Sequence, residues 1–148
     1  MAQADSATKV LDVPPGAREL LGGGLRFATV ATINEDGSPH QAVIWFRFAA
    51  DEIVINSLEG RVWPTNLRRD PRISLTVEDG YRWVSVRGTV ELVDDLDQAH
   101  ADIAEMARRY HADEPDRAEA MIRDRFNRQH RVSFRLALAS SKLHFHED

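Results

Sequence analysis

Residues 82–93 read RWVSVRGTVELV and carry the strongest strand signal of the chain. Val84, Val86, Val90 and Leu92 lie at alternate positions with Gly88 among them, and the intervening residues are mostly polar. Alternation with a period of two predicts an antiparallel strand that turns one face to a core. Gly88 lies in the middle of this strand, where a missing side chain favours a bulge or the close approach of another backbone.

Towards the N-terminus, further strand segments are separated by turn sequences. Residues 25–33 are rich in Phe, Val, Thr and Ile, and the turn sequence NEDGS at 34–38 separates them from a second strand at 41–48. Residues 52–56 and 73–77 fit a third and a fourth strand. Because short turns join consecutive strands, we expect them to pair in antiparallel fashion.

Helical patterns flank these strands. A short helix is expected over residues 17–21, and a second over residues 61–70 with Pro64 in its first turn. After the strand at 82–93, Asp95 fits the N-cap of a long helix at 96–110, and a further helix is expected over about 117–128.

Two strands, 132–139 and 142–146, close the chain. About six or seven antiparallel strands close most naturally into a barrel, because closure removes exposed sheet edges. The sequence therefore predicts a mainly β protein with flanking helices: a flexible N-terminus at residues 1–12 and one barrel domain at 13–148.

The composition excludes several classes of protein. The chain of 148 residues has no cysteine, which excludes disulfide scaffolds, iron–sulfur clusters and thiol nucleophiles. Its 19 Lys and Arg against 24 Asp and Glu give a net charge of −5, which disfavours nucleic-acid binding. The N-terminus lacks the pattern of a signal peptide, and no apolar run approaches the roughly 20 residues of a membrane span. We therefore expect a cytoplasmic protein without a nucleic-acid or membrane partner.

Several short motifs occur in an order that is specific as a set. These are ATVAT at 28–32, DGSPH at 36–40, the aromatic strand at 43–48, IVINS at 53–57, Arg61, NLRRDPR at 66–72 and RGTVE at 87–91. The series resembles the pyridoxamine 5'-phosphate oxidase-like, FMN-binding split β-barrel superfamily, and more narrowly its branch of oxidoreductases that use the deazaflavin coenzyme F420. The resemblance implies a six- or seven-stranded split barrel and a homodimer with the cofactor at the interface.

The resemblance also implies a site for the phosphate in the cofactor's tail, near the third strand and the helix after it. By their place in the motifs, Ser57, Arg61 and Asn66 take this role. The physical reason is sound, because the first turn of a helix offers free backbone N–H groups and a positive dipole end. The alternative is that Arg61 is a surface arginine, Ser57 a turn residue and Asn66 a helix-stabilising residue.

One position departs from the pattern. Relatives often carry a lysine three residues before Asn66, and here that position is Trp63. An indole cannot pair with phosphate, so Trp63 would contact the ring or the tail of the cofactor instead. Arg61 or Arg68 would then have to compensate for the missing charge.

A flat tricyclic ring needs apolar or backbone surfaces around it. In the superfamily the second strand lies along the ring, which assigns Gln41, Val43 and Trp45 to cofactor binding. Trp83 and Arg87 would complete the site from the second subunit. The alternative for both tryptophans is packing in the core or at the dimer interface.

Other charged and histidine residues predict no site. The arginines at 108–109 and 123–131 lie among Glu and Asp residues and are expected to form solvated helix faces. His144 and His146 share one strand face but lack a third ligand, so no metal is expected. No residue is assigned as a catalytic acid or base.

These observations predict an oxidoreductase that uses reduced coenzyme F420 to transfer hydride to a small conjugated acceptor, such as a quinone, tetrapyrrole or enone. Two alternatives remain open. One is an FMN-dependent oxidoreductase of the same fold, and the other is a non-catalytic carrier or sensor that binds a deazaflavin or haem.

Overall fold

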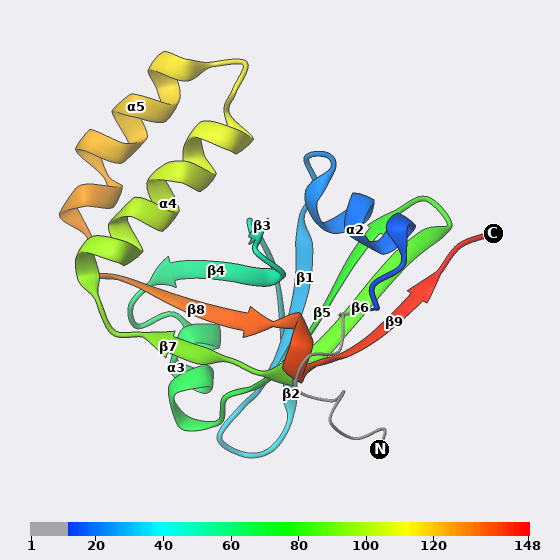
Figure 1. The fold of residues 1–148 in the computed structure, drawn as a ribbon. Coiled ribbons are helices and arrows are strands. Elements are labelled where there is room, and N and C mark those ends of the chain that lie inside the picture. The colour runs from blue at the N-terminus through cyan, green and yellow to red at the C-terminus, as the bar shows by residue number, and fades with distance from the viewer. Residues whose placement is uncertain (1–11) are drawn as a thin grey trace, which may run out of the picture.

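The structure is a computed structural model that describes residues 12–148, and Figure 1 shows its fold. The flexible segment predicted at residues 1–12 lies outside the described residues, except for Asp12. Two antiparallel sheets and flanking helices make up the described chain, so the predicted mainly β fold is confirmed.

The larger sheet has five strands in the order β2-β1-β5-β6-β9. Their bounds are β1 Ala28–Ile33, β2 Pro39–Ile44, β5 Arg72–Asp79, β6 Arg82–Thr89 and β9 Lys142–His146. The smaller sheet has four strands in the order β3-β4-β8-β7. Their bounds are β3 Arg47–Ala49, β4 Glu52–Leu58, β7 Glu91–Val93 and β8 Arg131–Ala137.

The structure has nine strands in its described part, rather than six or seven, because two predicted strands each pass from one sheet to the other. The predicted strand at 41–48 bends at Trp45 and Phe46 and becomes β2 and β3. The predicted strand at 82–93 bends at Val90 and becomes β6 and β7. Strands that switch sheets form the corners of such a barrel, and this arrangement splits it into two sheets.

Gly88 lies next to one of these corners, and side chains approach it closely, rather than the backbone that was expected. A Cβ atom at this position would lie 2.6 Å from Ser141 Oγ and 3.1 Å from a methyl carbon of Leu136. Leu136 lies in β8, and Ser141 lies in the connection from β8 to β9. A side chain at residue 88 would therefore require Ser141 and Leu136 to move.

The main core fills the space between the sheets with buried residues such as Val30, Leu75, Val86, Ile55 and Phe134. The helix α2 (Pro15–Gly22) contributes to this core, and α3 (Val62–Arg69) follows β4. A second, smaller core forms where the helices α4 (Leu96–Tyr110) and α5 (Pro115–Asp124) pack on β4.

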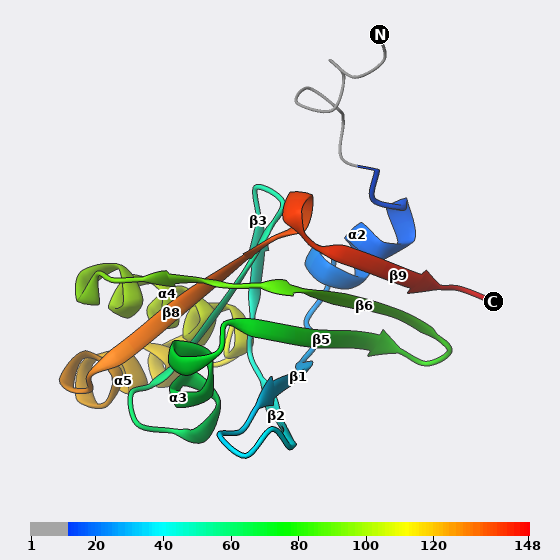
Figure 2. The same ribbon diagram turned by 90° about the horizontal axis from the view of Figure 1, so that it is seen from below.

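The helical pair α4–α5 lies at one end of the molecule, and β9 lies at the other (Figure 2). Asp95 caps α4 as predicted, because its carboxylate accepts a hydrogen bond of 3.1 Å from the backbone N–H of Gln98. Two short 3-10 helices, η1 (Phe126–Arg128) and η2 (Leu138–Ser140), flank β8. Within residues 12–148, no helix has the length and apolar character needed to cross a bilayer.

Candidate functional site

One pocket of about 380 Å³ gathers five of the nine predicted site residues. It lies where the β2–β3 corner, β4 and the start of α3 meet α4 and the connection from α5 to β8. This volume is typical of sites for small molecules. The lining residues are Phe27, Val43, Ile44, Trp45, Asn56, Ser57, Arg61, Trp63, Ile103, Met121, Arg125, Phe126, Gln129 and Arg131.

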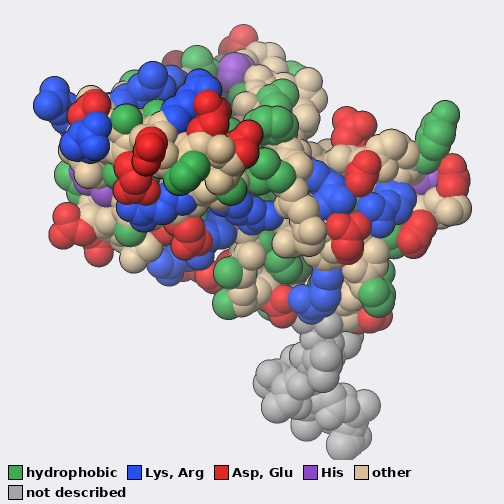
Figure 3. Space-filling model, turned by 90° about the horizontal axis from the view of Figure 1, so that it is seen from above, with side chains coloured by type: hydrophobic (Ala, Val, Ile, Leu, Met, Phe, Trp, Pro, Cys, Tyr) green, Lys and Arg blue, Asp and Glu red, His purple; other side chains and the backbone are tan. Residues whose placement is uncertain are grey.

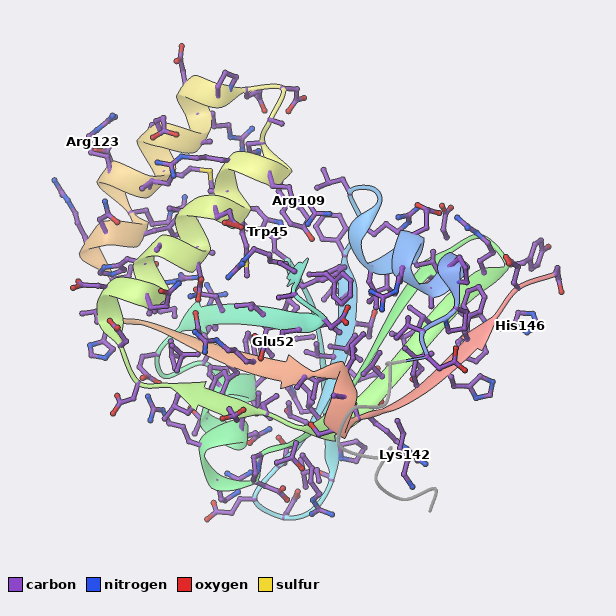
Figure 4. The ribbon with its side chains drawn as sticks, in the orientation of Figure 1. Trp45, Glu52, Arg109, Arg123, Lys142 and His146 are labelled. Carbon is purple, nitrogen blue, oxygen red and sulfur yellow. The ribbon has the colours of Figure 1, made fainter. Side chains whose placement is uncertain are left out.

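Aromatic rings form one side of this pocket. Trp45 stacks on Tyr110 of α4 with ring centroids 5.0 Å apart, and its edge meets Phe126 at 6.5 Å. Figure 4 shows Trp45 between α4 and the smaller sheet. Trp63 is 5% exposed and packs against Phe134 at a centroid distance of 6.1 Å. The rings are therefore held by the core and offer flat apolar surfaces to a ligand.

Three arginines also line the pocket. Arg61 is exposed and occupies the N-cap of α3, whereas Arg125 follows α5 and Arg131 begins β8. Arg131 is only 8% exposed, and its guanidinium lies 4.9 Å from the ring centre of Phe126. Burial, together with the positive charges of Arg61 and Arg125, lowers the pKa of Arg131 to about 10. It therefore remains positively charged at neutral pH.

No Asp or Glu belongs to the lining that the described residues give this pocket. A buried cation without a carboxylate is costly, because the protein does not replace the solvation that the charge has lost. The pocket therefore combines aromatic surfaces with an excess of positive charge. This combination suits a ligand that has a flat ring and an anionic group.

The structure places Ser57 in the lining, with 4% of its surface exposed, and its hydroxyl donates a hydrogen bond of 3.3 Å to the carbonyl of Leu58. Asn66 is buried but does not line the pocket. Its amide donates to Thr32 Oγ1 at 3.1 Å and to Asn34 Oδ1 at 2.9 Å. In this structure Asn66 ties α3 to β1, and its proposed role in binding the phosphate stays a prediction.

Arg68 was one of two arginines expected to replace the missing lysine. Instead it forms an ion pair with Glu59 and does not line the pocket. The additional positive charge comes from Arg125 and Arg131, which sequence reasoning had placed on solvated helix faces. The missed signal was the position of Arg131 in an apolar strand, where an arginine needs a specific partner.

Several other arginines of this region lie on solvated helix faces as predicted, whereas Arg109 is half-buried and donates a hydrogen bond of 2.7 Å to the carbonyl of Gly24. Arg108 pairs with Glu119, Arg117 with Glu114 and Arg123 with Asp124, all at exposed positions. Figure 3 shows basic and acidic side chains interspersed over the α4–α5 end of the molecule. Pairs of this kind contribute little to stability.

The remaining predicted residues lie apart, on the outer face of the larger sheet. Cross-strand pairs lead from Arg87 of β6 to Ser74 of β5, from Ser74 to Ala31 of β1, and from Ala31 to Gln41 of β2. Three strand spacings separate Arg87 from Gln41, which corresponds to about 14 Å. Within one chain, Arg87 and Gln41 are therefore too far apart to hold the same small ring from both sides.

Trp83 lies further along the same outer face. Its ring is 5.0 Å from that of His144 and 5.6 Å from that of His146. Figure 4 shows Lys142 and His146 on β9, on the side of the molecule away from Trp45 and the helical pair. Trp83 therefore does not reach the pocket of its own chain.

The sequence of residues 15–137 matches the family named pyridoxamine 5'-phosphate oxidase. Solved structures with this architecture include an F420 reductase, with 23% identity, 89% of this chain and 98% of that chain covered, and a TM-score of 0.69. A conserved hypothetical protein from Mycobacterium tuberculosis is 28% identical over 97% of this chain and 84% of its own, with a TM-score of 0.65.

A FAD and heme binding protein from Mycobacterium smegmatis is 21% identical over 88% of this chain and 69% of its own, with a TM-score of 0.62. The shared architecture therefore occurs in proteins named for different cofactors. The match to the family covers most of the sequence, from α2 to the end of β8. The chain belongs to the pyridoxamine 5'-phosphate oxidase family, whose fold is the split β-barrel.

Proposed function

We propose that this protein is a homodimeric oxidoreductase that uses reduced coenzyme F420 to reduce a small conjugated molecule of quinone, tetrapyrrole or enone type. The observation that carries the proposal is the pocket that joins aromatic surfaces to a group of arginines without a carboxylate. The likeness to an F420 reductase supports the choice of cofactor.

The residues of the pocket fit such a cofactor. Trp45 and Val43 offer an apolar surface for a flat ring, and the arginines together with the N-terminus of α3 offer positive charge for an anionic tail. When bound, the deazaflavin supplies the hydride. The protein binds the cofactor, orients it and leaves one face of the ring open to the acceptor.

The described lining of the pocket contains no Asp, Glu or His. No side chain there has an ordinary pKa near neutrality, and such a group is what general acid catalysis requires. We therefore propose that water provides the proton that accompanies hydride transfer. The role of the protein is to position the two reactants.

The homodimer would complete the site. Val43 and Phe27 line the pocket, yet they are 68% and 57% exposed, so residues 12–148 of the single chain leave the apolar mouth of the pocket uncovered. The outer face of the larger sheet carries small side chains such as Ala31, Ser74 and Ser85, which allow a second sheet to approach closely. A partner on this face would bring its own Trp83 and Arg87 to the mouth.

Two other functions use the same pocket. FMN also joins a flat ring to an anionic phosphate, so a flavin-dependent oxidoreductase is the second candidate. A non-catalytic carrier or sensor of a deazaflavin or haem is the third, and the absence of an acidic group from the described lining favours it over an enzyme that needs such a group.

The test is to mix purified protein with reduced F420 and a panel of quinones, tetrapyrroles and enones, and to follow the deazaflavin by absorbance. Oxidation that depends on protein and acceptor supports the proposal. Tight binding of F420 without oxidation by any acceptor favours the carrier. A yellow protein that retains FMN during purification favours the flavin enzyme.

A further inference from the structure

Arg131 lines the pocket and is 8% exposed, and the described residues use only part of the hydrogen-bonding capacity of its guanidinium. Its Nε donates to Asn56 Oδ1 at 3.0 Å, and its Nη1 donates to Gln129 Oε1 at 2.7 Å. A guanidinium has five N–H donors, and those of Nη2 have no hydrogen-bond partner among residues 12–148, which leaves them for a ligand. Both partners of Arg131 are neutral amides, which satisfy hydrogen bonds but leave the charge uncompensated.

A chain of hydrogen bonds fixes the orientation of Arg131. Asn56 Nδ2 donates to Ser133 Oγ at 2.9 Å, and Ser133 Oγ donates to Asp102 Oδ2 at 2.8 Å. From Arg131 to Asp102, each group thus donates a hydrogen bond to the next. The carboxylate of Asp102, where the chain ends, is buried and also accepts a hydrogen bond of 2.9 Å from Arg47. Bonds aligned in this way polarise and strengthen one another.

The chain crosses several elements that are far apart in sequence. Asp102 belongs to α4, Asn56 to β4, and Ser133 and Arg131 to β8. Each of these four side chains is less than 9% exposed. A network this well connected holds the guanidinium in one orientation before any ligand arrives, which reduces the entropy lost on binding.

We propose that Arg131, assisted by Arg125 and Arg61, binds the anionic tail of the ligand that this pocket takes, and that Asn56, Ser133 and Asp102 are positioning residues for Arg131. The proposal rests on the proposed function, because it assumes a ligand with a phosphate or carboxylate group. It assigns the tail to the connection between α5 and β8, in addition to the motif residues near α3.

The sharpest test is Gln129→Glu. Glutamate has nearly the same shape as glutamine and would place a carboxylate where Gln129 Oε1 accepts from Arg131. This internal ion pair should raise the melting temperature of the free protein and weaken the binding of F420 by about 10- to 100-fold. A change that only damaged the fold would lower both quantities.

The matched control is Arg123→Gln, which changes the net charge by the same amount on the neighbouring helix. Arg123 is exposed, pairs with Asp124 and points away from the molecule in Figure 4. Its loss should leave the affinity for F420 within about 2-fold of the wild type. An equal loss in both variants would indicate a general effect of charge and would overturn the proposal.

The ligands are chosen to separate the tail from the ring. Fluorescence titration should show that Gln129→Glu weakens F420 but not the same deazaflavin without its phosphate-bearing tail. The anionic tail of F420 contains a phosphate and carboxylates, and a form of F420 trimmed to its phosphate distinguishes between them. If Gln129→Glu also weakens binding of the trimmed form, Arg131 binds the phosphate. If it weakens only intact F420, Arg131 binds the carboxylates. Equal weakening of the tailed and tail-less ligands would overturn the proposal.

Inorganic pyrophosphate separates this proposal from the proposed function. If wild-type protein binds neither deazaflavin nor FMN, but pyrophosphate raises its melting temperature and Gln129→Glu abolishes the rise, the anion site stands while the redox function fails. If Gln129→Glu changes the response to none of these probes, the role of Arg131 is contradicted.

The positioning residues are tested with Ser133→Ala. This change removes the link between Asn56 and Asp102 but no group that contacts the ligand. We expect affinity for F420 to fall about 3- to 10-fold while affinity for the tail-less deazaflavin is unchanged. An equal change for the two ligands would mean that Ser133 supports the fold without orienting Arg131.

Discussion

Trp45 and Tyr110 stack with their rings 5.0 Å apart and their planes 11° apart. The same tyrosine fixes the corner where β2 passes into β3, because its hydroxyl donates to the carbonyl of Arg26 at 2.6 Å and accepts from the backbone N–H of Phe46 at 3.1 Å. Arg109, beside it in α4, donates to the carbonyl of Gly24 at 2.7 Å (Figure 4). The end of α4 therefore anchors the aromatic side of the pocket.

Tyr110→Phe should keep the stacked rings but lose both hydrogen bonds. The buried N–H of Phe46 and the part-buried carbonyl of Arg26 then lose their partner, so we expect the free energy of unfolding to fall by about 1–3 kcal/mol. Burial also raises the pKa of Tyr110, so the hydroxyl stays protonated at neutral pH and can donate. Urea denaturation measures the change, with Tyr81→Phe, at an 82% exposed position, as the control that should be neutral. Equal stabilities of the two variants would refute this anchoring role.

Trp63→Ala tests whether the tryptophan at the usual lysine position is part of the core. Trp63 packs against Phe134 and is almost fully buried, so its removal should lower the free energy of unfolding by about 3–5 kcal/mol. Trp63→Phe should cost much less. Val62→Ala, at the exposed neighbouring position, should change stability by less than about 0.5 kcal/mol. If Trp63 served only the ligand, Trp63→Ala would unfold at the urea concentration of the wild type.

The strand pattern predicted the fold because the alternation of apolar and polar residues in 82–93 indicates directly that one face of a strand is buried. It could not show that the chain changes sheets at Val90, since a bend keeps the same alternation of side chains. The alternation of residues also could not predict the order of the strands within each sheet. β5 lies beside β1 and β6 lies on the far side of β5, and only this order shows that Arg87 is remote from Gln41.

The candidate site was predicted in part for a similar reason. Val43, Trp45, Ser57, Arg61 and Trp63 meet because they belong to neighbouring motifs whose local structure follows from sequence. Arg125 and Arg131 come from the far end of the chain and join them only through tertiary packing. Helical periodicity and charge pairing describe a local face, and neither indicates which arginine faces a pocket.

Thr76→Lys tests the proposed homodimer. Thr76 lies at the centre of the outer face of the larger sheet, beside Thr29 and Ser85, so a lysine there would place a charge in the middle of the interface. Light scattering after size-exclusion chromatography should give a dimer for the wild type and a monomer for this variant. Asp116→Lys, at an exposed position in α5, should remain a dimer. If the wild-type protein is a monomer, the proposed homodimer is contradicted.

Trp83→Ala tests whether the partner contributes to the site. If the partner's Trp83 contacts the ring, its removal should weaken both F420 and the tail-less deazaflavin by a similar factor of about 5 to 10, without changing the oligomeric state. This pattern is the opposite of that expected for Arg131, which acts on the tail. Wild-type affinity for both ligands in Trp83→Ala would place the tryptophan outside the site.

The acid response of the protein should depend in part on Asp70. Hydrogen bonds from Arg72 lower the pKa of Asp70 from 3.8 to about 2. Because the folded pKa is the lower one, the stabilisation is present above pH 4 and is lost as the pH falls towards 2. Urea midpoints measured between these values should therefore fall less steeply for Asp70→Asn than for the wild type. Parallel profiles would show that the pair is not formed in solution.

The central claim is that the pocket beside Trp45 binds a deazaflavin. Titration of the wild-type protein with oxidised F420, followed by the fluorescence of the deazaflavin, tests it most directly. The account predicts saturable binding of one F420 per subunit, and weaker binding when Arg131 is paired with a glutamate at residue 129. Fluorescence that does not change at any protein concentration would contradict the account.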